Sequence, residues 1–277
     1  MSHHLVEISR LRHVYPDGTV ALRDVSLRIR HGEAVAIIGA NGAGKSTLLL
    51  HLNGALPATA GEVRIGDLAV TKAHLPAIRR TVGLVFQDPD DQLFMPTVYD
   101  DIAFGLHSLR LSPAELEQRV DRALAWVEAG SLREKPPYHL SAGEKKRVAI
   151  ATVLAMLPDI LVLDEPTSGL DPRARRQLIA LLRGFHHTRI ITSHDLDMVA
   201  DLCERTIVLH EGEVRADGPT LEIFRDRALL DACHLEPPLA MQGCPACAPA
   251  RPLPPAAGHP PLVAPHAGDD HDHPPAR

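Results

Sequence analysis

The sequence predicts an α/β fold in which a buried parallel sheet with flanking helices carries an inserted α-helical subdomain and ends in a disordered C-terminal tail. Short apolar runs without polar alternation are typical of strands buried on both faces of a parallel sheet. They occur at 34–38, 81–86, 160–163 and 189–191. Helical patterning fills the gaps between these runs. Of the 24 prolines, 12 lie between Pro237 and Pro275, where no periodicity is visible.

The helical subdomain is expected at about 88–157, because this segment lacks strand patterning except at its start. Within it, residues 113–128 are expected to form an amphipathic helix. Ser112 and Glu115 form a capping box at its start, and proline occupies the first helical position. The folded domain therefore spans about 1–232.

The C-terminal segment 233–277 is expected to be a disordered tail, because it has too few large apolar side chains to offset the entropy of ordering.

Composition excludes several classes of protein. The chain has 277 residues, of which 45% are hydrophobic and 23% charged, a balance typical of globular proteins. A net charge of -6 and 3% aromatic residues disfavour binding to nucleic acid or anionic lipid. No apolar run is long enough to span a bilayer, and residues 1–10 lack the apolar centre of a signal peptide. Four cysteines are too few for a disulfide framework. We expect a protein that stays in the cytoplasm.

A glycine-rich loop predicts phosphate binding. It follows the expected strand 34–38 and precedes a helical run at 48–52. Glycines let successive N–H groups turn towards a phosphate, and the helix N-terminus adds its positive end. Lysine bridges the outer phosphates and the serine hydroxyl can hold magnesium. The binding residues expected here are Gly39, Asn41, Gly42, Gly44, Lys45, Ser46 and Thr47.

Two carboxylates end the expected strand at 160–163. At the carboxyl edge of a parallel sheet, beside a phosphate loop, Asp164 can order magnesium and Glu165 can act as general base on an attacking water. An acidic pair that only solvates a strand end is the alternative. The phosphate loop favours the catalytic interpretation.

A second helix start lies at Leu140-Ser141-Ala142-Gly143-Glu144. Ser141 and Glu144 form another capping box, so the helix presents free N–H groups to an anion. Taken alone, the pattern indicates ordinary capping. It lies only about 16 residues before the acidic pair, and that combination is specific.

Together these motifs resemble the ATPase subunit of an ATP-binding-cassette (ABC) transporter over residues 5 to about 230. Residues 39–47 correspond to the family's Walker A motif, 140–144 to its signature and 160–165 to its Walker B motif. The stretch 87–94, with 141–150, is similar to the cobalt/nickel branch of energy-coupling-factor importers. The resemblance implies a P-loop NTPase core with an antiparallel β edge, with ATP and Mg²⁺ as cofactors.

The resemblance also implies roles for three isolated residues. Tyr15 would stack on adenine, although a strand-end tyrosine is the plainer interpretation. Gln87 would contact magnesium and the lytic water and would sense the membrane partner. His194 would position the γ-phosphate, although a lone histidine is usually structural. Residues 168–171 resemble the loop that touches the opposite protomer, and Asp171 is also a plain helix cap.

Two signature positions depart from the family pattern. Ala142 stands where glycine is usual, which is tolerable if its φ is negative. Glu144 stands where glutamine is usual, and its carboxylate could repel phosphate or reach back to cap Ser141. We predict that capping dominates.

The resemblance implies a head-to-tail pair of ATPases. Each nucleotide would lie between Ser141 and Gly143 of one protomer and the phosphate loop and sheet edge of the other. The residues at that edge are Lys45, Ser46, Gln87, Asp164, Glu165 and His194, with Ser46, Gln87 and Asp164 at the magnesium. Separate transmembrane subunits would dock near 88–104 and hold the chain at the cytoplasmic face of the cell membrane as a peripheral subunit.

The cargo is expected to be cobalt or nickel, with a vitamin or other small solute as the rival. The tail supplies possible metal ligands at Cys244, Cys247, His259, His266, His271 and His273, or it is a polar tail without such a role. Two other classes stay open. A soluble ABC ATPase remodelling nucleic acid or ribosomes usually carries two fused domains or a coiled coil, and neither is seen here. A metallochaperone with an incidental nucleotide site would lose metal binding on deletion of 233–277.

Overall fold

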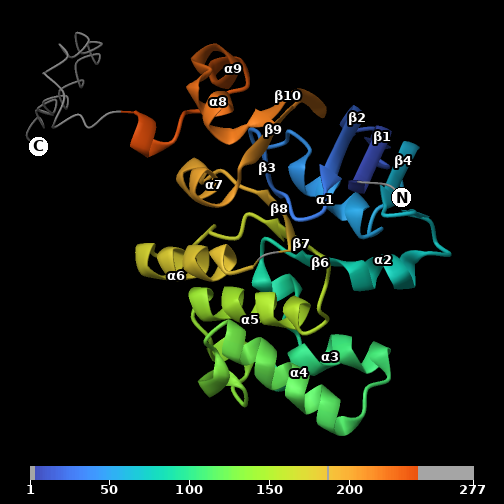
Figure 1. The fold of residues 1–277 in the computed structure, drawn as a ribbon, viewed down its shortest axis with the longest axis vertical. Coiled ribbons are helices and arrows are strands. Elements are labelled where there is room, and N and C mark those ends of the chain that lie inside the picture. The colour runs from blue at the N-terminus through green and yellow to red at the C-terminus, as the bar shows by residue number, and fades with distance from the viewer. Residues whose placement is uncertain (1–3, 186, 243–277) are drawn as a thin grey trace, which may run out of the picture. The chain divides into compact units, whose positions relative to one another are not determined.

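The computed structural model describes residues 4–185 and 187–242, whose elements are labelled in Figure 1. The strands are β1 (His4–Val14), β2 (Val20–Arg30), β3 (Ala34–Ile38), β4 (Ala60–Ile65), β5 (Leu68–Ala69), β6 (Val82–Val85), β7 (Ile160–Asp164), β8 (Thr188–Thr192), β9 (Arg205–His210) and β10 (Glu213–Pro219). The α-helices are α1 (Lys45–Leu52), α2 (Leu75–Thr81), α3 (Val98–Leu106), α4 (Pro113–Trp126), α5 (Ala142–Leu154), α6 (Pro172–Arg183), α7 (Leu196–Leu202), α8 (Thr220–Arg225) and α9 (Arg227–Ala232). Single 3₁₀ turns lie at Pro89–Asp91, His107–Leu109, Gly130–Leu132, Pro137–His139 and Leu239–Met241.

The central sheet has six strands in the order β10-β9-β3-β8-β7-β6. The pairs from β9 to β6 are all parallel, and β10 joins the edge antiparallel to β9. The carboxyl ends of β3, β6, β7 and β8 therefore meet at one edge of the sheet. The predicted α/β class and parallel sheet are confirmed.

A second sheet is antiparallel and has the strand order β2-β1-β4-β5. It packs on one face of the central sheet beside α1, as Figure 1 shows in blue. This is the antiparallel β edge that the resemblance implied.

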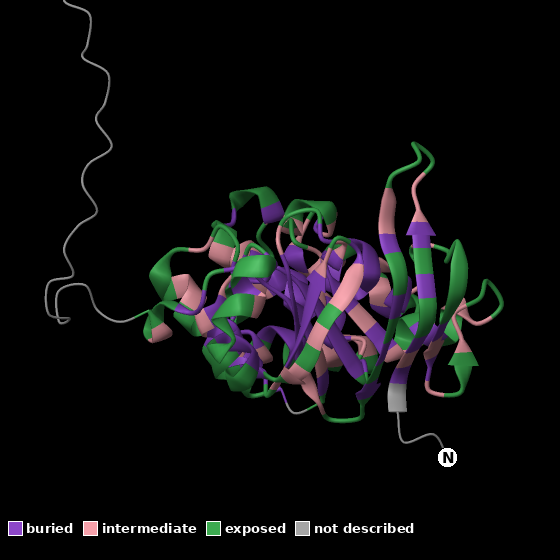
Figure 2. Ribbon diagram, turned by 90° about the horizontal axis from the view of Figure 1, so that it is seen from above, coloured by how far each residue is buried: buried purple, intermediate pink, exposed green. Residues whose placement is uncertain are grey.

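The core has two layers because the central strands alternate their side chains between two clusters. Val35 and Ile37 of β3 join the cluster beneath the antiparallel sheet, whereas Ala36 and Ile38 join the cluster on the opposite face. Burying each such aliphatic side chain contributes about 1.5 to 3 kcal/mol. Figure 2 shows the strands buried between exposed helical and β surfaces. Burial on both faces explains why these strands do not alternate apolar and polar residues. Polar side chains that bind or react are therefore expected only at the strand ends.

Helices α3, α4 and α5 form a helical layer below the central sheet in Figure 1, within the segment 88–157. Both predicted capping boxes are present. The Glu115 carboxylate accepts from the Ser112 backbone N–H, and the Glu144 carboxylate accepts from that of Ser141. No α-helix in the described ranges is both long and apolar enough to cross a membrane.

The structure differs from expectation at two boundaries. The apolar run 81–86 predicts a strand, but Thr81 ends α2 and the strand covers only Val82–Val85. At the other end, Cys233 and Leu235 are buried, so packing continues past the boundary expected near 232. The possible metal ligands from Cys244 onward lie outside the described residues.

Candidate functional site

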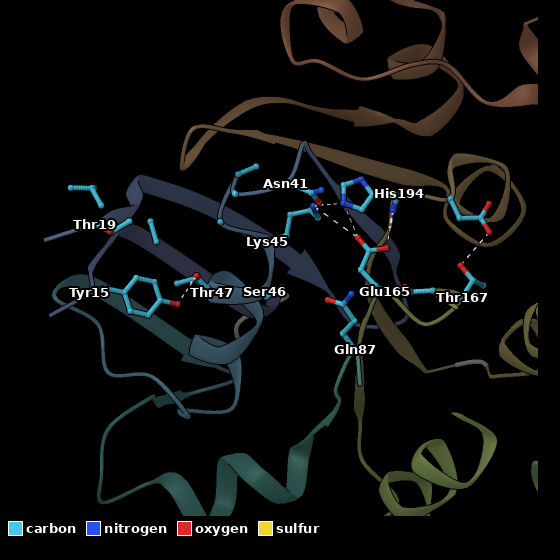
Figure 3. A pocket seen from close by; sticks show the side chains of 17 residues that line it. Tyr15, Thr19, Asn41, Lys45, Ser46, Thr47, Gln87, Glu165, Thr167 and His194 are labelled. Carbon is cyan, nitrogen blue, oxygen red and sulfur yellow. Dashed lines mark hydrogen bonds and ion pairs between the residues drawn. The ribbon is translucent and has the colours of Figure 1, made fainter. Parts of the chain in front are cut away.

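The phosphate loop joins β3 to α1 and opens into a cleft of about 620 Å³ (Figure 3). Gly44 immediately precedes the helix with φ 100°, and a Cβ there would lie 2.5 Å from the Ala21 carbonyl oxygen. A Cβ on Gly39 would lie 2.2 Å from the Leu209 carbonyl oxygen. These positions need glycine for different reasons, a left-handed backbone at one and a close approach at the other.

Lys45 lies at the centre of the cleft and is buried. Its ammonium donates to the carbonyl oxygens of Gly39, at 2.8 Å, and Ala40, at 3.3 Å. It also lies 3.1 Å from Nε2 of His194. Burial lowers the pKa of Lys45, and the Glu165 and Asp164 carboxylates oppose that shift. The loop therefore holds a desolvated cation where an anion can displace its neutral partners.

Glu165 follows β7 and turns its carboxylate into the same cleft (Figure 3). Its Oε2 accepts a hydrogen bond of 3.0 Å from the His194 backbone N–H. Its Oε1 is buried without a hydrogen-bond partner among the described residues, and lies 3.4 Å from Nε2 of His194 and 3.9 Å from the Lys45 ammonium. One oxygen is thus anchored by a hydrogen bond, while the other faces Lys45 and the His194 ring with its hydrogen-bonding capacity unused, so it can accept a proton from a water.

Asp164 ends β7 and is anchored by the neighbouring strand. The Thr192 hydroxyl, at the end of β8, donates to its Oδ1 at 2.5 Å. Asp164, Gln87 and Ser46 line a second cavity of about 630 Å³ beside the first. A carboxylate, an amide and a hydroxyl supply the oxygen ligands that Mg²⁺ prefers, so these three residues fit that ion.

Gln87 and His194 reach the cleft from two other strands of the sheet. Gln87 follows β6 and points towards Glu165, and His194 follows β8 beside it (Figure 3). Each of the four parallel strands β3, β6, β7 and β8 is thus followed by one or two polar groups at the carboxyl edge of the sheet. They lie close together because these strands are neighbours in the sheet.

Tyr15 lies at the opposite end of the cleft from His194 (Figure 3). Its hydroxyl shares a hydrogen bond of 2.9 Å with the Thr47 hydroxyl. The His13 ring packs edge-on against it at 4.6 Å. The tyrosine ring is therefore held beside the phosphate loop, at a place where it can meet the base of a nucleotide.

Ser141 and Gly143 do not line this cleft. Ser141 caps α5, and its hydroxyl and backbone N–H both donate to Glu144 Oε2, at 2.7 and 2.8 Å. These bonds lower the pKa of Glu144. Ala142 is absent from the described residues with positive φ, so the departure from glycine costs no backbone strain.

The cleft brings together most of the residues expected to bind or react. Those lining it are Tyr15, Asn41, Gly42, Gly44, Lys45, Ser46, Thr47, Gln87, Glu165 and His194. Sequence reasoning missed Thr192, whose hydroxyl anchors Asp164. It also missed Thr167 and Asp195, which line the cleft and share a hydrogen bond of 3.2 Å from the Thr167 hydroxyl to the Asp195 carboxylate. The position of Thr192 at the end of a strand parallel to β7 was the only available signal.

Comparison with models of known protein families identifies one family that this chain matches. The model of the ABC transporter family matches residues 22–168. A putative ABC transporter ATP-binding protein of Geobacter sulfurreducens is 68% identical over 247 residues, which cover 89% of this chain and 99% of the relative. The energy-coupling factor transporter ATP-binding protein EcfA of Methanothermobacter thermautotrophicus is 49% identical, over 84% of this chain and 77% of the relative.

Solved structures share the fold. CbiO1 of Clostridium perfringens, described as part of the ABC transporter complex CbiONQ, has a TM-score of 0.74 and 38% identity, covering 83% of this chain and 94% of that protein. The ATP-binding cassette MJ0796, solved as a dimer in a post-hydrolysis state bound to ADP and Pi, has a TM-score of 0.71 and 30% identity, covering 78% of this chain and 98% of that one.

Proposed function

Because this chain belongs to the ABC transporter family as an ATP-hydrolysing subunit, we propose that it energises a membrane importer of the energy-coupling-factor type, with cobalt or nickel as cargo. The observation that carries the catalytic part is the meeting of Lys45, Glu165 and His194 in one cleft beside the phosphate loop. ATP and Mg²⁺ are the cofactors of this chemistry.

The reaction begins with capture of the triphosphate. The loop N–H groups and α1 receive the phosphates, and Lys45 exchanges its carbonyl partners for the outer phosphates. Tyr15 stacks on adenine. Ser46, Gln87 and Asp164 would hold Mg²⁺, which would neutralise negative charge on the phosphates.

Proton transfer is then assigned to Glu165. Its Oε1, which makes no hydrogen bond within the described residues, accepts the proton of a water directed at the γ-phosphate, while the His194 N–H holds the other oxygen in place. Gln87 orients that water from β6. The His194 ring, 3.1 Å from the Lys45 ammonium, lies where it can contact the γ-phosphate.

The site needs a second protomer. Ser141 and Gly143 lie at the start of α5 and do not line the cleft of their own chain, so we assign their N–H and hydroxyl groups to the site of a partner. We assign a head-to-tail dimer that closes on ATP and opens after hydrolysis. The dimeric state of the MJ0796 cassette supports this assignment.

The membrane subunits are assigned to the face around α3. Phe94 and Phe104 are 63% and 54% exposed, and their rings contact edge-on at 5.1 Å. An exposed aromatic pair on a globular domain is typical of a contact surface. Docking there holds the chain at the cytoplasmic face of the membrane. The complex CbiONQ, of which CbiO1 is part, supports assembly with other subunits.

The relationship to EcfA supports the energy-coupling-factor type, and the cargo assignment depends on the resemblance of the stretch 87–94 to the cobalt/nickel branch. A vitamin or other small solute is the alternative within the same chemistry, because this subunit does not touch cargo. Asp90, within this stretch, contacts α5, because the Lys145 ammonium donates to its carboxylate at 2.6 Å.

Reconstitution tests the proposal. The chain is purified with its membrane partners and placed in liposomes, and ATP-driven uptake of radioactive cobalt, nickel and a vitamin is measured beside hydrolysis. We expect uptake of Co²⁺ or Ni²⁺ that Glu165→Gln abolishes. Hydrolysis indifferent to the partners contradicts transport, and uptake of the vitamin alone contradicts only the cargo.

A further inference from the structure

Lys146 is a buried cation that the mechanism above does not use. It lies in α5 and is only 3% exposed. Its ammonium donates to the backbone carbonyl oxygen of Gln87, and a second carbonyl oxygen, that of Glu165, lies 3.4 Å away. Burial of a lysine charge is expensive unless its hydrogen bonds are satisfied. A lysine kept there against this cost points to a role beyond packing.

The charge of Lys146 faces the acidic side of the site. Burial lowers the pKa of Lys146, while Asp88, Asp164 and Glu165 raise it. Within the described ranges, no carboxylate oxygen lies close enough to form an ion pair with it. The ammonium is therefore held by two peptide carbonyls rather than by a carboxylate. Through these hydrogen bonds Lys146 restrains the backbone at Gln87 and Glu165 rather than a side chain.

One of those peptides belongs to a residue with unusual backbone geometry. Glu165 has φ 44°, in the left-handed region that non-glycine residues rarely adopt. Its N–H donates to the carbonyl and hydroxyl oxygens of Thr192, both at 3.1 Å. Its carbonyl oxygen faces Lys146. Contacts on both sides of the residue hold a conformation that aims the carboxylate into the cleft.

The other peptide is that of Gln87, in the segment that leads from the central sheet to α3. This is the helix assigned to the membrane contact. Gln92 ties this segment to α5, because its amide donates at 2.7 Å to the Ala149 carbonyl and to the Thr152 hydroxyl. Lys145 adds the bond to Asp90. Residues 87–92 and α5 are thus joined at several points, and Lys146 is where this unit meets Glu165.

We propose that Lys146 is a positioning residue for Glu165, which holds the peptide of the general base and ties its alignment to the Gln87 segment. The inference rests on the proposed function through the role given to Glu165. When the membrane subunits move this segment, the orientation of the Glu165 carboxylate changes through Lys146, without a change in the phosphate loop that binds the nucleotide. Lys145 joins the same segment and helix but does not reach Glu165, so it is the matched control.

A double-mutant cycle on the full-length chain tests this proposal. Single-turnover hydrolysis of MgATP and MgATP affinity are measured for Lys146→Met, Lys146→Arg and Lys145→Met, with and without Glu165→Gln. We expect Lys146→Met to slow hydrolysis by about tenfold or more with affinity changed by less than about threefold. Lys146→Arg restores most of the rate. In the Glu165→Gln background, Lys146→Met has less than about a twofold effect, because the residue that Lys146 positions no longer carries a basic carboxylate.

The outcomes separate the two proposals. If Glu165→Gln leaves the rate unchanged, the assignment of the general base is wrong. If Glu165→Gln slows hydrolysis but Lys146→Met does not, or slows it equally in both backgrounds, only the role of Lys146 is wrong. The role of Lys146 is also wrong if Lys145→Met reproduces the effect. Should Lys146→Met fail to fold, Lys146→Gln takes its place in the cycle, with the same outcomes.

Discussion

Replacement of Thr192 by valine tests how the sheet edge holds the acidic pair. Thr192 is fully buried, and its hydroxyl donates to Asp164 at 2.5 Å. Valine keeps the shape and removes this donor together with the hydroxyl acceptor of the Glu165 N–H, which keeps its bond of 3.1 Å to the Thr192 carbonyl oxygen. A hydrogen bond to a charged group contributes about 1.5 to 3 kcal/mol. If all of it is used to aim Asp164, kcat/KM for MgATP falls by about 10- to 150-fold.

Thr188 provides a matched control for that variant. It begins the same strand, is also fully buried, and its hydroxyl accepts a hydrogen bond of 2.9 Å from the Gly32 N–H. Thr188→Val should lower the free energy of unfolding by about 1 kcal/mol and leave the affinity for Mg²⁺ unchanged. Urea unfolding and steady-state kinetics across a magnesium titration measure both effects. Equal kinetic losses in the two variants, or none in Thr192→Val, would refute the role of the hydroxyl.

Three further predictions concern charge and surface. Glu144→Gln should change the rate of ATP hydrolysis by less than about tenfold, because glutamine also caps Ser141, and a larger increase would mean that repulsion of phosphate dominates. Burial lowers the pKa of His51 to about 4 from 6.5, so the folded state binds its proton less readily and stability falls as pH drops from 6.5 towards 4. Urea unfolding at several pH values should show a weaker fall in His51→Leu. Phe94→Ala should weaken co-purification with the membrane subunits, whereas Leu221→Ala, at a 48% exposed leucine on α8, should not.

Much of the fold could be predicted from the sequence, because strands buried on both faces of a sheet are continuous apolar runs that are easy to recognise. The runs at 34–38 and 160–163 lie in strands of the central sheet, and both capping boxes start helices. The boundaries between helices and strands were harder to predict. Thr81 continues the apolar run before β6, but it is the last residue of α2, and apolar content alone cannot separate a helix end from a strand start.

The residues to which we assign catalysis could be located in the sequence where a motif adjoins a strand end, and the residues that hold them could not. Lys45 and Glu165 stand beside recognisable strands. Thr192 looks in the sequence like one more β-branched strand residue, and Lys146 like one more charge on a helix. Their roles depend on which strand lies next to β7 and on how α5 packs beneath it. Those are tertiary facts that no local spacing encodes.

The backbone of Glu165 connects these supports to catalysis. Left to local preference, a glutamate would avoid φ 44° in favour of the extended region. Extended backbone would continue β7 and send the carboxylate away from its present partners, the His194 N–H and the space in front of Lys45. The contacts from Thr192 on one side and Lys146 on the other therefore select the reactive conformation at a cost in strain of about 1 to 3 kcal/mol. A base held in this way is sensitive to any movement of its supports. In the proposed assembly one of those supports, Lys146, lies on α5, which a partner ATPase touches and which is tied to the segment leading to the membrane contact. Hydrolysis can then be controlled by the assembly without any change in the residues that grip the nucleotide.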